Sequence, residues 1–268
     1  MKRNAYFWYE FGAVILFIAV IFFIRNSRQK ISDLPEILDS GRLSVLTDSS
    51  SIGFCKTAGT VSGFQYEIVK AFADTMGLEL VISEQNDFKY CIDGLKSADY
   101  NLIANFTPIT TEWNKEILFT NSLLSSRQVL VQRYTNDSLK LKHVNRHADL
   151  ANDSIYIPLN SPFKLRLNHL SDEIASPITI IEVKNKSSEQ MVKLVASGKI
   201  KYTICDELFA KKLKLQYPNL DVSLPVGFNQ ELAWAVHPKS RKLLAELNDF
   251  LSDFIGSSAY WDIYNKYY

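Results

Sequence analysis

Short apolar runs alternate with amphipathic helical stripes along this chain, and this alternation restricts the fold more than any other sequence feature. In the first half, strand-like runs at 43–47, 78–83 and 101–104 are separated by two stripes at helical spacing, which are Tyr66, Val69, Ala73 and Met76, and Phe88, Cys91, Ile92 and Leu95. A second series covers 155–217, with strand-like runs at 155–158 and 178–183 and a stripe over Phe163, Leu167, Leu170 and Ile174. Such alternation predicts parallel sheets with helices on both faces. We therefore predict an α/β protein of two lobes, with a cleft at the carboxyl ends of its strands.

The segments that flank these two series add further predicted elements. After Ser240 the chain carries a strongly amphipathic helical stripe, formed by Leu243, Leu244, Leu247, Phe250, Leu251 and Phe254. The aromatic stretch 260–264 fits core packing better than a binding platform. Residues 31–40 read as a short polar connector with one helical turn. We therefore place the start of the folded part near Arg42.

The composition excludes several classes of protein. Lys and Arg number 30, and Asp and Glu number 29, among 268 residues, so the net charge is +1 and no overall field favours nucleic acid. Hydrophobic residues make up 47% of the chain, which is typical of a globular protein rather than a disordered one. The three cysteines, Cys55, Cys91 and Cys205, allow one disulfide at most, and whether Cys55 pairs with Cys91 stays open.

The N-terminus carries an apolar segment long enough to span a membrane. Residues 11–24 contain no charge, and residues 5–9 extend the segment to about 20 residues, the span of a bilayer core, if Glu10 lies near one interface. The segment ends Phe22-Phe23-Ile24-Arg25 and lacks the small-x-small site of a cleaved signal peptide. We therefore predict a short tail and an uncleaved transmembrane helix over 1–30. Basic residues on both sides leave its orientation open on charge alone.

Signatures of common enzymes and metal sites are absent from the sequence. No G-x-S-x-G, H-E-x-x-H, P-loop or G-x-G-x-x-G motif occurs. His143 and His147 have the spacing of two ligands on one helix face, but no Cys or carboxylate completes a set, so we expect no metal. Cys205 precedes the carboxylates of Asp206 and Glu207 and is most simply a buried thiol at a strand end. We therefore expect no catalytic group and no cofactor.

Three segments resemble the bacterial family 3 solute-binding proteins, the amino-acid-binding type of the periplasmic binding protein fold. The stretch Gly63-Phe64-Gln65-Tyr66-Glu67-Ile68 resembles the family's "G-F-x-x-[DE]-[IL]" helix entry. Residues 105–120 are similar to the family's segment at the end of the third strand, and residues 198–206 to its "G-K-x-D-x-x-x-x-D" pattern. The resemblance covers about residues 41–267.

The resemblance implies the domain organisation of a periplasmic binding protein type II fold. After the anchor (1–30) and the connector (31–40), lobe 1 comprises 41–131 plus 226–268, and lobe 2 comprises 132–225. The two chain crossings, near Gln132 and Pro225, form a hinge, and ligand binding favours closure of the lobes.

Within this family, residues 199–206 and 217–224 look most similar to the binding module of membrane-bound lytic transglycosylases F, which cleave peptidoglycan with a separate lysozyme-like domain. The chain stops at Tyr268, so we expect no catalytic domain and no enzymatic activity. The resemblance implies a single-pass inner-membrane protein with a periplasmic receptor domain. Its ligand is expected to be amino-acid-like, a peptide or peptidoglycan-derived, and its partner a membrane or cell-wall enzyme. Two alternatives stay open: a periplasmic enzyme of the same fold, dehydratase-like or transglycosylase-associated, and the substrate-binding component of an ABC transporter.

The resemblance also implies ligand-binding residues at the strand ends. In lobe 1, Asp48 follows the first strand, Phe54 lies in the loop after it, and the third strand ends with Asn105, Phe106 and Thr107. In lobe 2, Asn160 and Ser161 precede a helix whose free N–H groups suit a carboxylate, and Asp206 ends a strand where family members bind the ligand's α-amino group. Capping of a turn or helix is the alternative for Asp48, Ser161 and Asp206.

One predicted subsite departs from the family pattern. Trp113 stands where the family places the arginine that clamps a ligand α-carboxylate, and Pro108 stands where a backbone N–H joins that clamp. An indole suits a ring, an apolar side chain or a cation better than an anion. We therefore predict that free α-amino acids bind weakly, and that a larger ligand contacts Trp113 and places its anionic group at Ser161. The alternative is that Trp113 packs on Phe106 and the site no longer binds.

Overall fold

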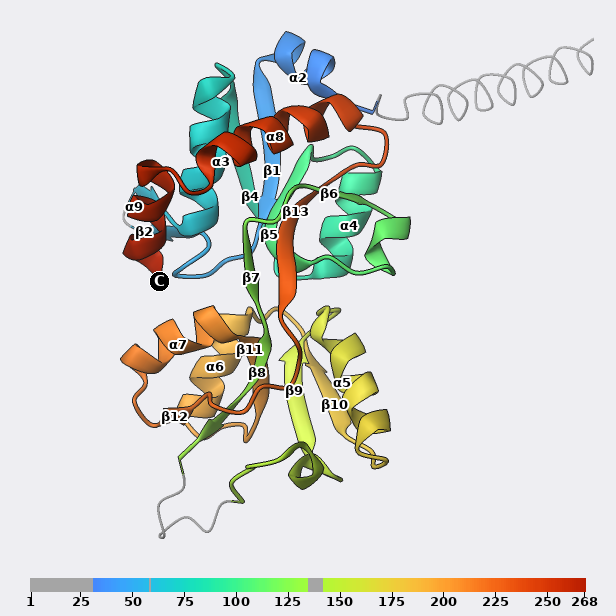
Figure 1. Ribbon diagram of the computed structural model, residues 1–268, viewed down its shortest axis with the longest axis vertical. Coiled ribbons are helices and arrows are strands. Elements are labelled where there is room, and N and C mark those ends of the chain that lie inside the picture. The colour runs from blue at the N-terminus through green and yellow to red at the C-terminus, as the bar shows by residue number, and fades with distance from the viewer. Residues whose placement is uncertain (1–30, 58, 135–141) are drawn as a thin grey trace, which may run out of the picture.

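The computed structural model describes residues 31–57, 59–134 and 142–268, and it contains two α/β lobes stacked end to end (Figure 1). Each lobe has one mixed sheet with helices on both faces. The prediction of a two-lobed α/β protein is therefore confirmed. The predicted anchor lies outside the described residues, and no helix within them is long and apolar enough to cross a membrane.

The sheet of lobe 1 joins strands from both ends of the chain. Its order is β4 (Glu79–Glu84), β1 (Arg42–Thr47), β5 (Leu102–Pro108), β13 (Gln230–Val236) and β6 (Leu118–Phe119), and β7 (Leu124–Ser126) also pairs with β13. Strands β4, β1 and β5 run parallel, whereas β13 runs antiparallel to β5. A small hairpin is formed by β2 (Cys55–Thr57) and β3 (Thr60–Ser62).

Helices cover both faces of this sheet and bury two clusters of apolar side chains. The larger cluster includes Phe64, Phe72, Trp234, Leu247 and Tyr260, and it lies under α3 (Phe64–Thr75), α8 (Arg241–Phe254) and α9 (Ser258–Tyr267). On the other face, α4 (Phe88–Lys96) and the short 3-10 helix η1 (Trp113–Lys115) enclose the second cluster. Of the aromatic stretch predicted to pack in the core, Tyr260 is buried there and Tyr264 is partly buried against it, whereas Trp261 is exposed.

The sheet of lobe 2 follows the same plan with its own core on each face. Its order is β10 (Thr179–Val183), β9 (Ser154–Pro158), β11 (Thr203–Asp206), β8 (Gln128–Arg133) and β12 (Leu220–Asp221). The helices of this lobe are α5 (Phe163–Glu173), α6 (Ser188–Ala196), α7 (Glu207–Gln216) and the short η2 (His147–Leu150). Strands β9, β10 and β11 run parallel, so their carboxyl ends lie at one edge.

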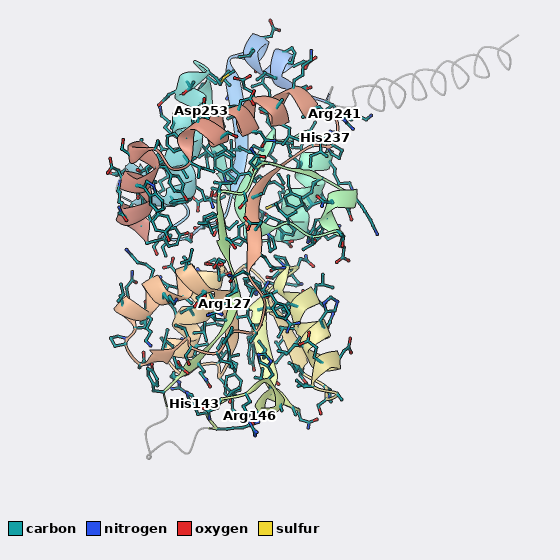
Figure 2. All side chains as sticks on the ribbon, viewed as in Figure 1. Arg127, His143, Arg146, His237, Arg241 and Asp253 are labelled. Carbon is teal, nitrogen blue, oxygen red and sulfur yellow. The ribbon has the colours of Figure 1, made fainter. Side chains whose placement is uncertain are left out.

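The crossings between the lobes differ in position from the prediction. Strand β8 pairs with β11 in the second sheet, so residues 128–131, assigned to lobe 1 from the sequence, belong to lobe 2. The first crossing therefore lies at Arg127, between β7 and β8 (Figure 2). On the return, Val226 still packs in the core of lobe 2 and its N–H donates to the Gln128 carbonyl oxygen. The chain then enters β13, which belongs to lobe 1.

The predicted connector at 31–40 is instead a packed part of lobe 1. Helix α2 (Leu34–Ser40) starts at an Asp33–Glu36 capping box, and Ile37 is fully buried in the larger cluster. The Asp33 carboxylate also accepts hydrogen bonds from the backbone N–H groups of Lys242 and Leu243, at the start of α8. The folded part thus begins before Arg42, because one apolar side chain and one cap tie this turn to α8.

Candidate ligand-binding site

A cavity lies between the two lobes, where the carboxyl ends of β1, β5, β9 and β11 meet. Its volume is about 140 Å³. Lobe 1 contributes Asp48, Ser50, Ile52, Gly53, Gln65, Gln85, Asn86, Phe88, Asn105, Phe106 and Tyr268. Lobe 2 contributes Pro158, Ser161, Pro162, Phe163, Ser187, Ser188, Cys205, Asp206 and Phe209. Five of the residues predicted from the sequence, Asp48, Asn105, Phe106, Ser161 and Asp206, are therefore brought together here.

Asp48 is fixed at the end of β1 by the neighbouring strand. Its backbone N–H donates to Oδ1 of Asn105 on β5 at 2.7 Å, which links two lining residues that are 57 positions apart. Removal of the carboxyl from bulk water raises the pKa of Asp48, the Ser50 hydroxyl lowers it in part, and the charge of Glu189 raises it further. The ionised form of Asp48 is therefore disfavoured unless a cation reaches it.

Asp206 faces the same cavity from lobe 2 and also caps a helix. Its Oδ1 accepts hydrogen bonds from the N–H groups of Leu208 at 3.0 Å and Phe209 at 3.3 Å, at the start of α7. Burial nevertheless raises the pKa of Asp206, although these two bonds oppose the shift. The two interpretations of Asp206 considered from the sequence, helix cap and cavity group, are thus compatible.

The start of α5 differs from the prediction made for Ser161. Pro162, rather than Ser161, is the N-cap, and α5 begins at Phe163. The Phe163 N–H points back to the Ser161 hydroxyl at 3.3 Å, and the Lys164 N–H donates to the Ser161 carbonyl oxygen at 3.2 Å. Proline has no N–H, so the first donors of this helix are absent or already paired. The helix start at Ser161 thus offers fewer free N–H groups than expected, and the carboxylate subsite there stays a prediction.

Trp113 does not line this cavity. Its ring packs edge-on against Phe88, with 4.9 Å between ring centroids, and it borders a separate groove with Lys89, Glu112 and Pro162. Phe88 stands between the indole and the cavity wall. The alternative that Trp113 packs on Phe106 is therefore wrong, because the packing partner comes from α4. A ligand contact of Trp113 stays a prediction, and the groove that it borders also includes Ser161.

Three other predicted residues have structural roles outside the cavity lining. Phe54 is buried and packs edge-on against Tyr66. Thr107 is buried within β5. Asn160 has a left-handed backbone conformation, and its side-chain amide donates to both carboxylate oxygens of Asp87, at 3.0 and 3.1 Å. This last contact joins lobe 2 to lobe 1.

A second contact between the lobes lies on the other side of the cavity. The Ser51 N–H of lobe 1 donates to Oε2 of Glu189 on α6 at 2.6 Å. Burial raises the pKa of Glu189, but hydrogen bonds from Lys193 and Ser51 outweigh this effect and lower it below its ordinary value. Glu189 is therefore a charged, buried link, and together with the Asp87–Asn160 contact it joins lobe 1 to lobe 2.

Several lining residues were not anticipated from the sequence. The first turn of α6 has a Ser187–Gln190 capping box, a pattern that is readable in the sequence and that marks a helix start facing the cavity. Phe88, Phe209 and Tyr268 carry no such signal, because apolar residues in helical stripes predict core positions equally well. Tyr268 is nevertheless close to both carboxylates: burial, together with the charges of Asp206 and Asp48, raises its pKa well above the ordinary range.

The described residues offer little for nucleophilic or metal chemistry. Burial raises the pKa of the Cys205 thiol well above its ordinary value, which makes it a poor nucleophile. His143 lies near the far end of lobe 2 and contacts Asp221, whereas His147 contacts the Pro225 carbonyl oxygen (Figure 2). Within the described ranges no cluster of three or more His, Cys, Asp or Glu side chains suits a metal ion, and all three cysteines are unpaired.

A cavity enclosed by two α/β lobes, at the carboxyl ends of strands from both sheets, defines a two-lobed solute-binding protein. Residues 42–268 match the family model of bacterial extracellular solute-binding proteins, family 3. The chain therefore belongs to this family, as its motifs indicated.

Similar proteins add detail to this assignment. The chain is 26% identical over 255 residues to a membrane-bound lytic murein transglycosylase F of Desulfosudis oleivorans; the match covers 95% of this chain but 54% of that protein. The chain thus spans about half the length of this relative. Its fold is similar to that of an ancestral arginine-binding protein bound to arginine, with a TM-score of 0.73, 21% identity and coverage of 85% and 98% of the two chains. A solute receptor for L-cysteine of Neisseria gonorrhoeae has a TM-score of 0.76 at 16% identity, with 88% and 93% covered.

Proposed function

We propose that this chain is a receptor module that binds a small amine-bearing molecule between its lobes and does not convert it chemically. The observation that carries the proposal is the pair of carboxylates, Asp48 from lobe 1 and Asp206 from lobe 2, that face one cavity. A ligand that contacts both groups stabilises the closed arrangement of the lobes. The names of the similar proteins support an amino-acid-like, peptide or peptidoglycan-derived ligand.

The lining chemistry favours binding over catalysis. General acid–base or nucleophilic catalysis needs a titrating group poised beside the substrate. Among the lining residues, histidine is absent and Cys205 is held as a thiol. Burial and two nearby carboxylates raise the pKa of Tyr268 and hold it as a neutral phenol, so the remaining candidates are Asp48 and Asp206. The described residues therefore give less support to a dehydratase-like enzyme than to a receptor or a transport component.

The module is proposed to act at the inner membrane, with the folded domain in the periplasm. The apolar segment 5–24 supports an anchor, and the similarity to a membrane-bound murein transglycosylase supports a cell-wall enzyme as partner. Fractionation of cells and determination of the mature N-terminus test the anchor. A mature chain that starts beyond Ile24 contradicts it.

A thermal-shift screen of the full chain with amino acids, peptides, amines and muropeptides tests the binding function. A true ligand raises the melting temperature as its concentration rises, because it binds the folded form alone. The same compounds are then incubated with the protein and analysed by mass spectrometry. Chemical conversion of a ligand, or release of glycan fragments from sacculi, contradicts a non-catalytic receptor.

A further inference from the structure

The charged groups that line the cavity have one sign. Asp48 and Asp206 are acidic, and the lining set, all of it within the described residues, contains no Lys, Arg or His. Nearby basic side chains are paired with other acids: Lys193 with Glu189 at 2.6 Å, and Arg127 with Glu207 at 2.7 Å. The cavity therefore offers two carboxylates and no compensating cation of its own.

The positions that suit an anion in this fold are also unsuited to one here. Pro108 has no N–H, Trp113 is directed to Phe88, and the first donors of α5 are paired or absent. The start of α6 is the other helix start at the cavity, where Ser187 and Ser188 lie. Its cap hydroxyl already accepts the Gln190 N–H, and its first turn carries the buried carboxylate of Glu189. An anion placed there lies beside the Glu189 carboxylate, and Lys193 of the same helix is already paired with that carboxylate.

The remaining walls suit the body of an organic cation. Phe88, Phe106, Phe163, Phe209 and Tyr268 all line the cavity. Aromatic rings attract an ammonium group through their electron-rich faces and stack on apolar or planar groups.

We infer that the ligand presents an ammonium group without a free carboxylate beside it: an amine, an amino amide or the amino end of a peptide. This inference rests on the proposed receptor function and narrows its ligand class. The ammonium lies between Asp48 and Asp206, and the rest of the molecule lies against the aromatic walls. A free α-amino acid fits poorly, because its carboxylate meets neutral hydroxyl and amide groups but no cation in the lining, and it lies close to acidic groups.

Titration calorimetry of the full chain with matched compounds tests the inference. One series is lysine, lysinamide and cadaverine, and the other is phenylalanine, phenylalaninamide and phenethylamine. Each series keeps the amine and changes the carboxylate to an amide or to hydrogen. We expect the amide and the amine to bind at least about tenfold more tightly than the acid in one or both series.

Two variants and a control assign any binding to the cavity. Asp206→Asn and Asp48→Asn each remove one lining charge and are expected to weaken amine binding by about tenfold or more. Asp262→Asn removes one exposed charge on α9, outside the lining, and is expected to leave affinity unchanged.

The outcomes separate the ligand class from the receptor function. Amino acids that bind as tightly as their amides, with loss of affinity in Asp206→Asn, overturn the ligand class but support the receptor. Binding of the amines that is unaffected by both cavity variants overturns the inference. If no compound of either series binds but a muropeptide or another anion does, the inferred ligand class is wrong and the receptor function stands. If no compound in the wider screen binds, both the ligand class and the receptor function are wrong.

Discussion

Gly63 is the first residue of the family motif. We expect it to be the position where the addition of a single methyl group damages the site most. Its backbone has φ +138° and ψ 150°, a region that is almost restricted to glycine and costs about 1–3 kcal/mol for other residues. A Cβ atom at Gly63 would lie 2.2 Å from the Gly53 carbonyl oxygen and 2.7 Å from the Phe54 Cα atom. The neighbouring loop must therefore move.

That loop both lines the cavity and caps α3. The N–H groups of Phe64 and Gln65 donate to the carbonyl oxygens of Ile52 and Gly53, at 2.6 and 3.1 Å. Loss of these two bonds costs about 1–3 kcal/mol at about 0.5–1.5 kcal/mol each. Together with the backbone strain, Gly63→Ala should lower the free energy of unfolding by about 2–6 kcal/mol and weaken any ligand that contacts Gly53.

Urea unfolding of the full chain, followed by tryptophan fluorescence, measures this effect. Gly77→Ala is the matched control, because Gly77 also has positive φ (65°) but a Cβ there meets no atom within 4 Å. The control should lose about 1–2 kcal/mol from backbone strain alone. Equal losses in the two variants would refute the assignment of a steric role to the loop at Gly53.

Three further predictions test the helix cap at Asp206, the pH dependence of its carboxyl group and the contact between the lobes. Asp206→Asn keeps a capping oxygen whereas Asp206→Ala loses it, so Asn should be the more stable variant at pH 7.5 by about 1 kcal/mol, measured by urea unfolding. Burial raises the folded-state pKa of Asp206, so the stability that its protonated carboxyl contributes is present at low pH and lost as the pH rises through that pKa. Asp206→Asn should therefore be more stable than the wild type at pH 7.5 and lose this advantage toward pH 3.8. A pH-independent difference in the free energy of unfolding would contradict the shift. Asn160→Asp places two carboxylates together at the Asp87–Asn160 contact and should increase the radius of gyration measured by X-ray scattering. Adding Asp87→Asn restores a hydrogen-bond donor, keeps an N-cap for α4 and should reverse the increase. If the double variant does not reverse it, this contact does not hold the lobes together.

The sequence could predict which segments reach the cavity, but not the direction of each side chain. Strand ends are readable because apolar runs stop at them, and together with the family resemblance this placed Asp48 and Asp206 at the cavity. Asn105 also lines the cavity, although β5 continues to Pro108. The predicted packing of Trp113 on Phe106 was wrong because a motif aligns positions along the chain, whereas the direction of the indole ring depends on α4, which supplies Phe88. Asn160 lies outside the cavity lining for a similar reason, since its amide reaches Asp87, 73 residues away in the other lobe.

The limits of the lobes were misjudged for a related reason. Strand β8 is a run of apolar and polar residues that fits either sheet. The choice depends on its antiparallel pairing with the distant strand β11, in which Gln128 lies opposite Asp206. The connector at 31–40 was judged by its polar composition, although one buried residue, Ile37, and one cap, Asp33, attach it to α8. Both errors concern contacts between segments far apart in the sequence.

The Asp206 carboxylate caps α7, but its burial at the cavity indicates a second role besides capping. Asp149 provides an internal comparison, since its carboxylate also accepts two backbone N–H groups, from Asn145 and Arg146. Those bonds lower the pKa of Asp149, whereas burial raises the pKa of Asp206 despite its two cap bonds. A carboxylate that served as a cap alone would be more favourable when exposed, or when replaced by the neutral caps Ser or Asn. The burial of Asp206 toward the cavity disfavours its charged form, and a bound ammonium group would remove that penalty.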